Sequence, residues 1–381
     1  MVNLPKGFRG SGISAGIKAN GARDLALIVN DGPQKFGTAV FTSNKIVAAP
    51  VTWSKQVIAD QEVSAIILNS GGANACTGPE GFADTHKTAE YLSSKLGVSA
   101  GDIVVCSTGL IGERLPMQSV LSGIDLAVES LSSQNADLLA AAIMTTDSHA
   151  KFFFKEFKGA QIFGMAKGAG MLAPSLATML SVITTDALVD ESCADIFKVA
   201  VDQTFGRIDS DGCTSTNDTV TFMSSGASGV RLQDSELQAL IYECAENLAH
   251  QLISDAEGHT KIVEITTVNA ASLEDALEVG RSCARNNLLK CALNGSDANW
   301  GRVLAAVGMT NAHFDPHTVD VSLNGVMVCR NSAPGIDRSE VDLSGKQIQI
   351  LIDLKAGDFR GTIWTNDLSA MYVHENSAYS S

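Results

Sequence analysis

The sequence predicts a layered α+β fold with a main domain and a smaller C-terminal α/β domain. At 381 residues and 45% hydrophobic content, the chain is long enough to bury one large or two moderate cores. Strand-like and helix-like segments are mixed without strict alternation, which disfavours a doubly wound parallel sheet. No internal repeat is present. We place the main domain in 1–270, the smaller domain in 271–370 and a tail in 371–381.

The first third of the chain consists mainly of short segments rich in Val, Ile and Thr, separated by glycine and polar turns, which is typical of strands. These predicted strands are Ala26–Asn30, Thr38–Ser43, Pro50–Lys55, Ser64–Asn69 and Ile103–Ser107. One helix interrupts them at Glu80–Leu96, where apolar residues recur near helical spacing and Gly97 can end the helix.

The middle of the chain contains two helical stretches, 116–131 and 136–144, and a strand at Lys151–Phe157. The segment Gly164–Pro174 is too rich in glycine to be regular throughout, whereas Thr178–Thr185 is apolar and β-branched. A flexible loop is therefore expected to run into a buried strand.

The remainder alternates between the two element types. Helices are predicted at Glu191–Phe205, Asp234–Ser254 and Leu273–Leu293. Strands are predicted at Thr219–Met223, Lys261–Val268, Val319–Leu323, Gln347–Leu354 and Arg360–Trp364.

Composition excludes several classes of partner. The formal net charge is −15 and no cluster of Lys and Arg interrupts it, so we expect no nucleic-acid partner. No run of about 18 apolar residues is present and the start of the chain lacks the apolar core of a secretion signal. We therefore expect no membrane association and a cytoplasmic location. The eight cysteines form no C-x-x-C pair and are interpreted as free, buried thiols.

Three familiar motifs are rejected. The G-x-S-x-G at 12–16 has neither the strand before it nor the helix after it that a nucleophile elbow needs, so we interpret it as a turn. Gly168-Ala169-Gly170 completes only half of a dinucleotide fingerprint. Asp209–Gly212 resembles part of a calcium loop, but Val220 stands where the bidentate Glu should be. The histidines lack ligand spacing, and we expect neither a metal nor a cofactor.

One segment of the sequence suggests a catalytic mechanism. A Gly- and Pro-containing loop ends in Ala177 and Thr178 at the head of a buried strand, the layout that a self-cleaving nucleophile requires. The Thr178 hydroxyl would attack the Ala177 carbonyl, and hydrolysis of the ester would split the chain. The new α-amine, with an ordinary pKa of about 8, could then act as general base for the same hydroxyl. Spacing alone strongly favours the plainer interpretation, a loop that enters a core strand.

The exact amino-acid sequence of this segment is more specific than its spacing. Residues 167–180, K-G-A-G-M-L-A-P-S-L-A-T-M-L, resemble the cleavage signature of the ornithine acetyltransferase (glutamate N-acetyltransferase) family of arginine biosynthesis. The resemblance continues through C-S-T-G-L-I-G-E (106–113), M-T-T-D (144–147), S-T-N-D-T (215–219), D-A-E-G (255–258), G-S-D-A-N-W-G-R-V (295–303) and E-N-S-A-Y-S-S (375–381).

This resemblance implies an αββα sandwich of the N-terminal-nucleophile type, cut into an alpha chain, 1–177, and a beta chain from 178. It also implies a heterotetramer of two alpha and two beta chains. Thr108 and Gly109 match the family's oxyanion pair. The matching substrate-contacting positions are Thr145, Lys167, Thr178, Glu257, Asn376 and Ser381. The C-terminal tail is therefore expected to be ordered and to return to the site.

The implied activity is acetyl transfer from N2-acetyl-L-ornithine to L-glutamate through an acetyl-Thr178 intermediate. We expect Lys167 to meet a substrate carboxylate and Glu257 an ammonium. The sequence leaves open whether acetyl-CoA is a second donor, which separates bifunctional from single-function members. A self-processed aminopeptidase or amidohydrolase, which gives the acyl group to water, is the alternative enzyme. A processed protein with a binding or structural role is a third possibility.

Overall fold

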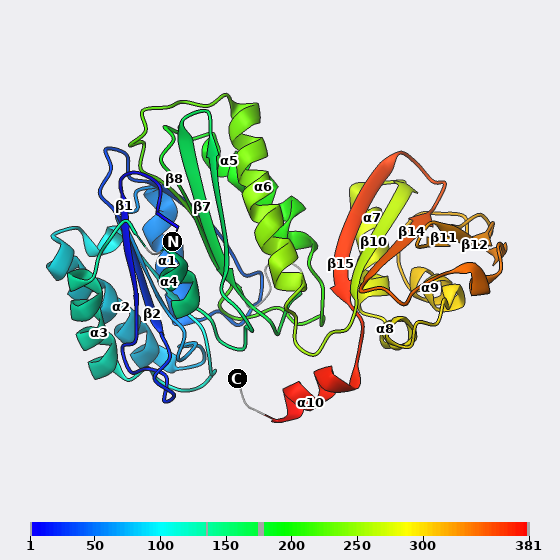
Figure 1. Cartoon of the computed structure of the whole chain (residues 1–381), viewed down its shortest axis with the longest axis horizontal. Helices are drawn as coiled ribbons and strands as arrows, with labels where there is room; N and C mark the ends of the chain where they lie inside the picture. The colour runs from blue at the N-terminus through cyan, green and yellow to red at the C-terminus, as the bar shows by residue number, and fades with distance from the viewer. Residues whose placement is uncertain (1, 135, 174–178, 379–381) are drawn as a thin grey trace.

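The computed structural model describes residues 2–134, 136–173 and 179–378, and Figure 1 shows their arrangement. The first sheet has the order β1-β2-β4-β5. Its strands are β1 (Phe8–Ile13), β2 (Leu25–Asn30), β4 (Ala65–Asn69) and β5 (Ile103–Ser107). Helices α1 (Ala49–Val57), α2 (Gly78–Leu96) and α3 (Met117–Glu129) pack on it.

The second sheet has the order β3-β9-β8-β7-β6. Its strands are β3 (Phe36–Phe41), β9 (Thr219–Ser224), β8 (Leu180–Thr185), β7 (Ala160–Lys167) and β6 (Lys151–Phe157). Helices α5 (Cys193–Gln203) and α6 (Asp234–Ile253) cover its outer face, and the short α4 (Ala136–Ala142) contacts both sheets.

The two sheets face each other across one apolar core. Leu27 and Ile67 of the first sheet share this core with Phe163 and Val182 of the second, and all four side chains are buried. A separate core lies between the second sheet and helices α5 and α6. The layers therefore run helix, sheet, sheet, helix, which confirms the predicted αββα sandwich.

The C-terminal lobe is built on a third sheet, of order β13-β12-β11-β14-β10-β15, with an apolar core of its own. Its strands are β10 (Ile262–Ala270), β11 (Asp320–Leu323), β12 (Val326–Arg330), β13 (Ala333–Pro334), β14 (Gln347–Asp353) and β15 (Phe359–Asn366). Its helices are α7 (Leu273–Ala284), α8 (Asn287–Asn294) and α9 (Trp300–Val307). The smaller α/β domain is confirmed, while its boundary at 270/271 stays a prediction.

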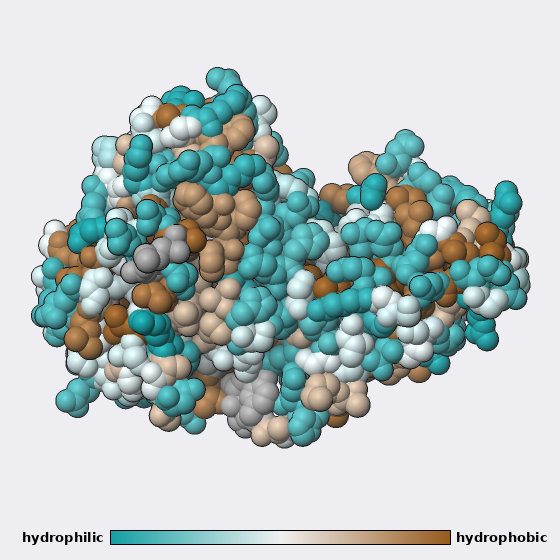
Figure 2. Space-filling view, in the orientation of Figure 1, coloured by the Kyte–Doolittle hydropathy of each residue, from teal (hydrophilic) through white to brown (hydrophobic). Residues whose placement is uncertain are grey.

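The last described element is α10 (Ala370–Ala378), which leaves the C-terminal lobe and runs back toward the main layers (Figure 1). None of its residues is buried. Figure 2 shows hydrophilic residues interspersed with apolar ones over the visible face of the protein. None of the helices in the described parts of the chain is long and apolar enough to cross a membrane.

Several local predictions were wrong. Pro50–Lys55 lies in α1 instead of a strand. The loop expected within Gly164–Pro174 begins only after Lys167, because Gly164–Lys167 belongs to β7. The single helix predicted at Leu273–Leu293 is divided into α7 and α8. A strand, β1, does precede Ser14, although no helix follows it. All the cysteines are free, but Cys76, Cys213 and Cys291 are exposed.

Candidate active site

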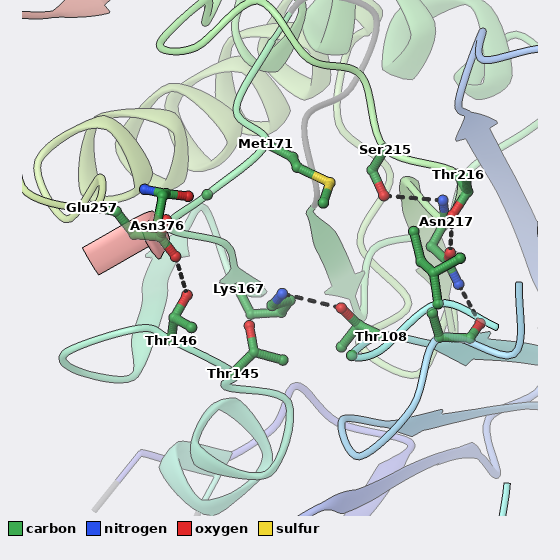
Figure 3. A pocket seen from close by; sticks show the side chains of 14 residues that line it. Thr108, Thr145, Thr146, Lys167, Met171, Ser215, Thr216, Asn217, Glu257 and Asn376 are labelled. Atoms are coloured by element: carbon green, nitrogen blue, oxygen red, sulfur yellow. Dashed lines mark hydrogen bonds between the residues drawn. The ribbon is translucent and has the colours of Figure 1, made fainter. Parts of the chain in front are cut away.

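A pocket opens where the two stacked sheets, the loop after β7 and the C-terminal helix meet. Six residues singled out in the sequence line it: Thr108, Gly109, Thr145, Lys167, Glu257 and Asn376. Figure 3 shows that the side chains of Thr108, Thr145, Lys167, Glu257 and Asn376 come from widely separated segments. The remaining three, Ala177, Thr178 and Ser381, lie outside the described residues. The structure thus brings together every described residue of the predicted site.

Thr108 and Gly109 follow β5 directly and offer hydrogen-bond donors to the pocket. The backbone N–H of Thr108 is already used, because it donates to the Asn69 carbonyl at 3.0 Å. Its hydroxyl accepts from Lys167 Nζ at 3.1 Å, which leaves the hydroxyl proton available for donation. Gly109 has φ of +130°, and a Cβ there would lie 2.7 Å from the Gly72 nitrogen. Only glycine fits this close approach.

Lys167 is the last residue of β7 and is almost completely buried. Burial lowers the pKa of its ammonium, and the nearby Asp147 carboxylate opposes that shift. Burial also acts on Asp147, whose pKa it would raise, but the charges of Lys167 and Lys151 and the Gly168 N–H outweigh it. The pKa of Asp147 is lowered to about 2. Asp147 is therefore ionised at neutral pH.

Lys151 joins two segments that are distant in the sequence. Its Nζ donates to Asp147 Oδ1 at 2.6 Å and to Asp255 Oδ2 at 2.5 Å, and all three side chains are buried. Asp147 also accepts the backbone N–H groups of Thr145, at 2.9 Å, and Gly168, at 2.7 Å. One carboxylate thus fixes the backbone on both sides of the pocket, and Lys151 ties it to the segment that carries Glu257.

Glu257 is held at the rim by contacts from two sides. Its backbone N–H donates to the Ala169 carbonyl at 3.0 Å, and its Oε1 accepts from the Thr146 hydroxyl at 2.7 Å. Gly170 packs so closely that a Cβ there would lie 2.6 Å from the Glu257 carboxylate. Asn376 reaches the same pocket from α10, where its Nδ2 donates to the Tyr372 carbonyl at 3.0 Å.

The opposite wall is formed by the segment before β9. Asn217 Nδ2 donates to the carbonyls of Ala73, at 2.6 Å, and Ser107, at 2.8 Å, and so joins this segment to the first sheet. Asp218 is fully buried, and its Oδ1 accepts the Met179 N–H at 2.9 Å. Burial raises the pKa of Asp218 well above its usual value. The head of β8, directly after position 178, is therefore anchored beside the pocket.

Comparison with known proteins identifies the family of this chain. The ArgJ family model matches residues 9–381, which is nearly the whole chain. This chain belongs to the ArgJ family. A Thermobifida fusca relative named arginine biosynthesis bifunctional protein ArgJ is 54% identical over 380 residues, covering 100% of this chain and 99% of its own length. The protein of the same name from Streptomyces coelicolor is 53% identical over 381 residues, with 100% of both chains covered.

A solved structure is also similar. Ornithine acetyltransferase from Mycobacterium tuberculosis, complexed with ornithine, is 48% identical, with a TM-score of 0.41. The match covers 45% of this chain and 92% of that one.

Sequence reasoning on this ArgJ-family chain missed the groups that hold the pocket together. Three of these groups lie inside the quoted motifs M-T-T-D, D-A-E-G and S-T-N-D-T: Asp147, Asp255 and Asn217. The motifs pointed to these residues, but the sequence did not indicate what each residue does. Lys151 lies outside these motifs, and only the fold reveals its contacts. Among the described residues, no group of three or more His, Cys, Asp or Glu side chains is arranged to hold a metal ion.

Proposed function

We propose that this chain transfers an acetyl group from N2-acetyl-L-ornithine to L-glutamate by a two-step mechanism. The chain first cleaves itself between Ala177 and Thr178. Thr178 then takes the acetyl group from the donor nitrogen, ornithine leaves, and the α-amine of glutamate attacks the acetyl-enzyme. Both steps form one bond to the acetyl carbon and break another, so no redox or metal chemistry is required.

The observation that carries this proposal is the convergence of Thr108, Gly109, Lys167 and Glu257 on one pocket beside the anchored Met179. Met179 is held through both of its backbone polar groups, because its N–H donates to Asp218 and its carbonyl accepts the Thr219 N–H at 3.1 Å. A nucleophile must be held within a narrow range of positions to attack a carbonyl efficiently. Fixing the residue that follows position 178 serves that need.

The donors of the oxyanion site follow from the hydrogen bonds at Thr108. Since its N–H is engaged with Asn69, its hydroxyl is the group that donates to the developing oxyanion, together with the Gly109 N–H. Lys167 donates to the same hydroxyl oxygen and so strengthens it as a donor. Losing one such donor typically lowers the rate by about 10²–10³.

The charges in the pocket suit both amino acids. We assign Lys167 to a substrate carboxylate and Glu257 to a substrate ammonium, with Thr145 and Asn376 as hydrogen-bonding groups and Ser381 as a contact from the C-terminal end. Both substrates carry an α-carboxylate, and the ornithine side chain adds an ammonium. A single pocket with one buried cation and one anion at its rim can therefore accept them in turn.

Three further features complete the proposal. The two fragments stay together and pair into a heterotetramer of two alpha and two beta chains. The enzyme works in the cytoplasm and requires no cofactor. A donor assay with acetyl-CoA in place of N-acetylornithine decides whether this chain also makes N-acetylglutamate from acetyl-CoA.

Acetyl transfer between N-acetylornithine and glutamate, measured with the wild-type and Thr178→Ala proteins, tests the proposal. We expect the wild type to transfer acetyl and the variant to remain one uncut chain without activity. Full activity of a pure, uncut Thr178→Ala protein would refute the role of Thr178. Acetate released equally fast with and without glutamate would instead identify a hydrolase.

A further inference from the structure

A second pocket lies next to the first, between the main layers, the C-terminal lobe and α10. Six charged or phenolic residues line it: Asp211, Glu257, Arg285, Lys290, Asp367 and Tyr372. Glu257 lines both pockets, and Tyr372 lies one helical turn before Asn376 of the first. The cavity has a volume of about 110 Å³. A water molecule occupies about 30 Å³ in the liquid, so there is room for a small molecule.

Some of these charged groups are already satisfied by the protein. Lys290 is buried, and its Nζ donates to the Ser210 carbonyl at 2.7 Å, to Thr365 Oγ1 at 3.0 Å and to the Asn366 carbonyl. An ammonium has three protons to donate, so Lys290 has none left. Asp367 accepts four hydrogen bonds from Thr260, Lys261 and Asn294.

Arg285 and Asp211 retain capacity for a ligand. Arg285 donates through Nε to Asp209 Oδ2 at 2.8 Å, while its two terminal nitrogens donate to no described residue. Those two nitrogens can bind a carboxylate in bidentate fashion. Among the described residues, Asp211 accepts one backbone N–H at each oxygen, from Leu172 at 3.0 Å and from Cys213 at 3.2 Å. A carboxylate offers about four acceptor positions, so Asp211 can accept more.

The charge of the lining selects the class of ligand. Three carboxylates and two cations give a formal net charge of −1. A purely anionic ligand would face all three carboxylates, and a purely cationic one would leave Arg285 unused. Burial raises the pKa of the Tyr372 phenol to about 12, with the charges of Asp211 and Glu257 adding to the effect, so this side of the pocket has a negative potential that favours a cation.

We propose that this second pocket binds a basic amino acid, whose carboxylate lies on Arg285 and whose ammonium groups face Asp211 and Glu257. Such a molecule carries one negative and two positive charges. These charges complement the net charge of the pocket and the separation of its arginine from its carboxylates. The site is coupled to the first pocket through Glu257. It also reaches the loop toward the proposed cleavage site, since Asp211 holds the Leu172 N–H.

Isothermal titration of the full-length protein with L-lysine tests the site, because lysine carries no acetyl group and is read without turnover. We expect lysine to bind in the second pocket in addition to any lysine that the first pocket holds in place of ornithine, so the part of the titration that depends on Arg285 is the signal. L-Norleucine, which lacks the side-chain ammonium, and cadaverine, which lacks the carboxylate, should each bind about tenfold or more weakly, the usual effect of losing one charged hydrogen bond. Failure of acetyl transfer would leave these results unchanged, so the two proposals fail separately.

Variants locate the lysine. We expect Arg285→Gln to weaken binding about tenfold or more, whereas Arg231→Gln, which alters an exposed arginine paired with Asp190, should bind like the wild type. Arg285→Lys keeps a cation beside Asp209 but lacks the bidentate geometry, so a folded Arg285→Lys protein should also bind more weakly. No lysine binding by the wild type would overturn the proposal. Equal binding by the Arg285 and Arg231 variants, or loss of binding in Thr108→Val of the first pocket, would do so as well.

Discussion

Replacing Lys151 with methionine tests whether the buried cation stabilises the pocket. The change removes a side chain that is fully buried between Asp147 and Asp255, which are 0% and 8% exposed. Methionine fills similar space without a charge, so two buried carboxylates lose their shared partner. Breaking a buried pair in this way typically costs about 3–5 kcal/mol. Asp147 would keep its hydrogen bonds from Thr145 and Gly168.

Thermal and urea unfolding of the wild type and Lys151→Met measure the effect. We expect the variant to lose about 3–5 kcal/mol of unfolding free energy at pH 7, which for a chain of 381 residues corresponds to a melting temperature roughly 4–6 °C lower. The difference should shrink as the pH falls toward 4, because the unpaired carboxyls take up protons and no longer carry buried charge.

Lys198→Met is the matched control. Lys198 pairs with Asp202 on the surface, where both side chains are more than half exposed, so this change should cost less than about 1 kcal/mol. Equal stabilities of the two variants, or a Lys151→Met deficit that does not change with pH, would refute the assignment of a buried charge network.

Three further predictions concern the same region. The folded pKa of Asp147 is lowered to about 2 from 3.8, so its ionised form contributes about 2 kcal/mol to the free energy of unfolding. This contribution is present above pH 4 and is lost as the pH falls through 2. In acid unfolding, the Asp147→Asn variant should lack that pH dependence. Thr108→Val should lower kcat about 10²–10³-fold while Thr108→Ser stays near wild type, and equal loss in both would argue against the hydroxyl as donor. Gly258→Ala should raise KM, because its Cβ would lie 2.2 Å from the Tyr372 nitrogen and displace α10 with Asn376; unchanged substrate kinetics would show that α10 does not serve the site.

The layers of the fold could be predicted because most segments show their period locally. The helix at 50–55 could not be predicted, since Val51 and Thr52 are β-branched and six residues are too few to show helical spacing. The buried positions Val51, Ser54 and Val57 repeat at three residues and so form one face of α1. Over the full stretch from 49 to 57, this spacing indicates a helix.

The first strand was missed for a different reason. Its sequence FRGSGI contains two glycines, which normally weaken a strand. Here a Cβ at Gly12 would lie 2.1 Å from the Leu138 carbonyl oxygen, so glycine is required for α4 to pack against β1. That requirement arises between residues more than a hundred positions apart, and no local pattern reports it.

The candidate site divides in the same way. Thr108, Lys167 and Glu257 could be predicted, because they lie in the sequence motifs that carry the resemblance to a family. The support from Lys151 and Asp255 could not be predicted, since the two are 104 residues apart and each alone is one charged residue among many. Burial and pairing are properties of the folded chain.

Mass spectrometry of the purified protein, incubated with N-acetylornithine in the absence of glutamate, tests the central claim most directly. We predict two fragments separated between residues 177 and 178, with an acetyl group on the N-terminal threonine of the second and its loss when glutamate is added. An active protein that remains one intact chain, or an acetyl group carried by any other residue, would contradict it.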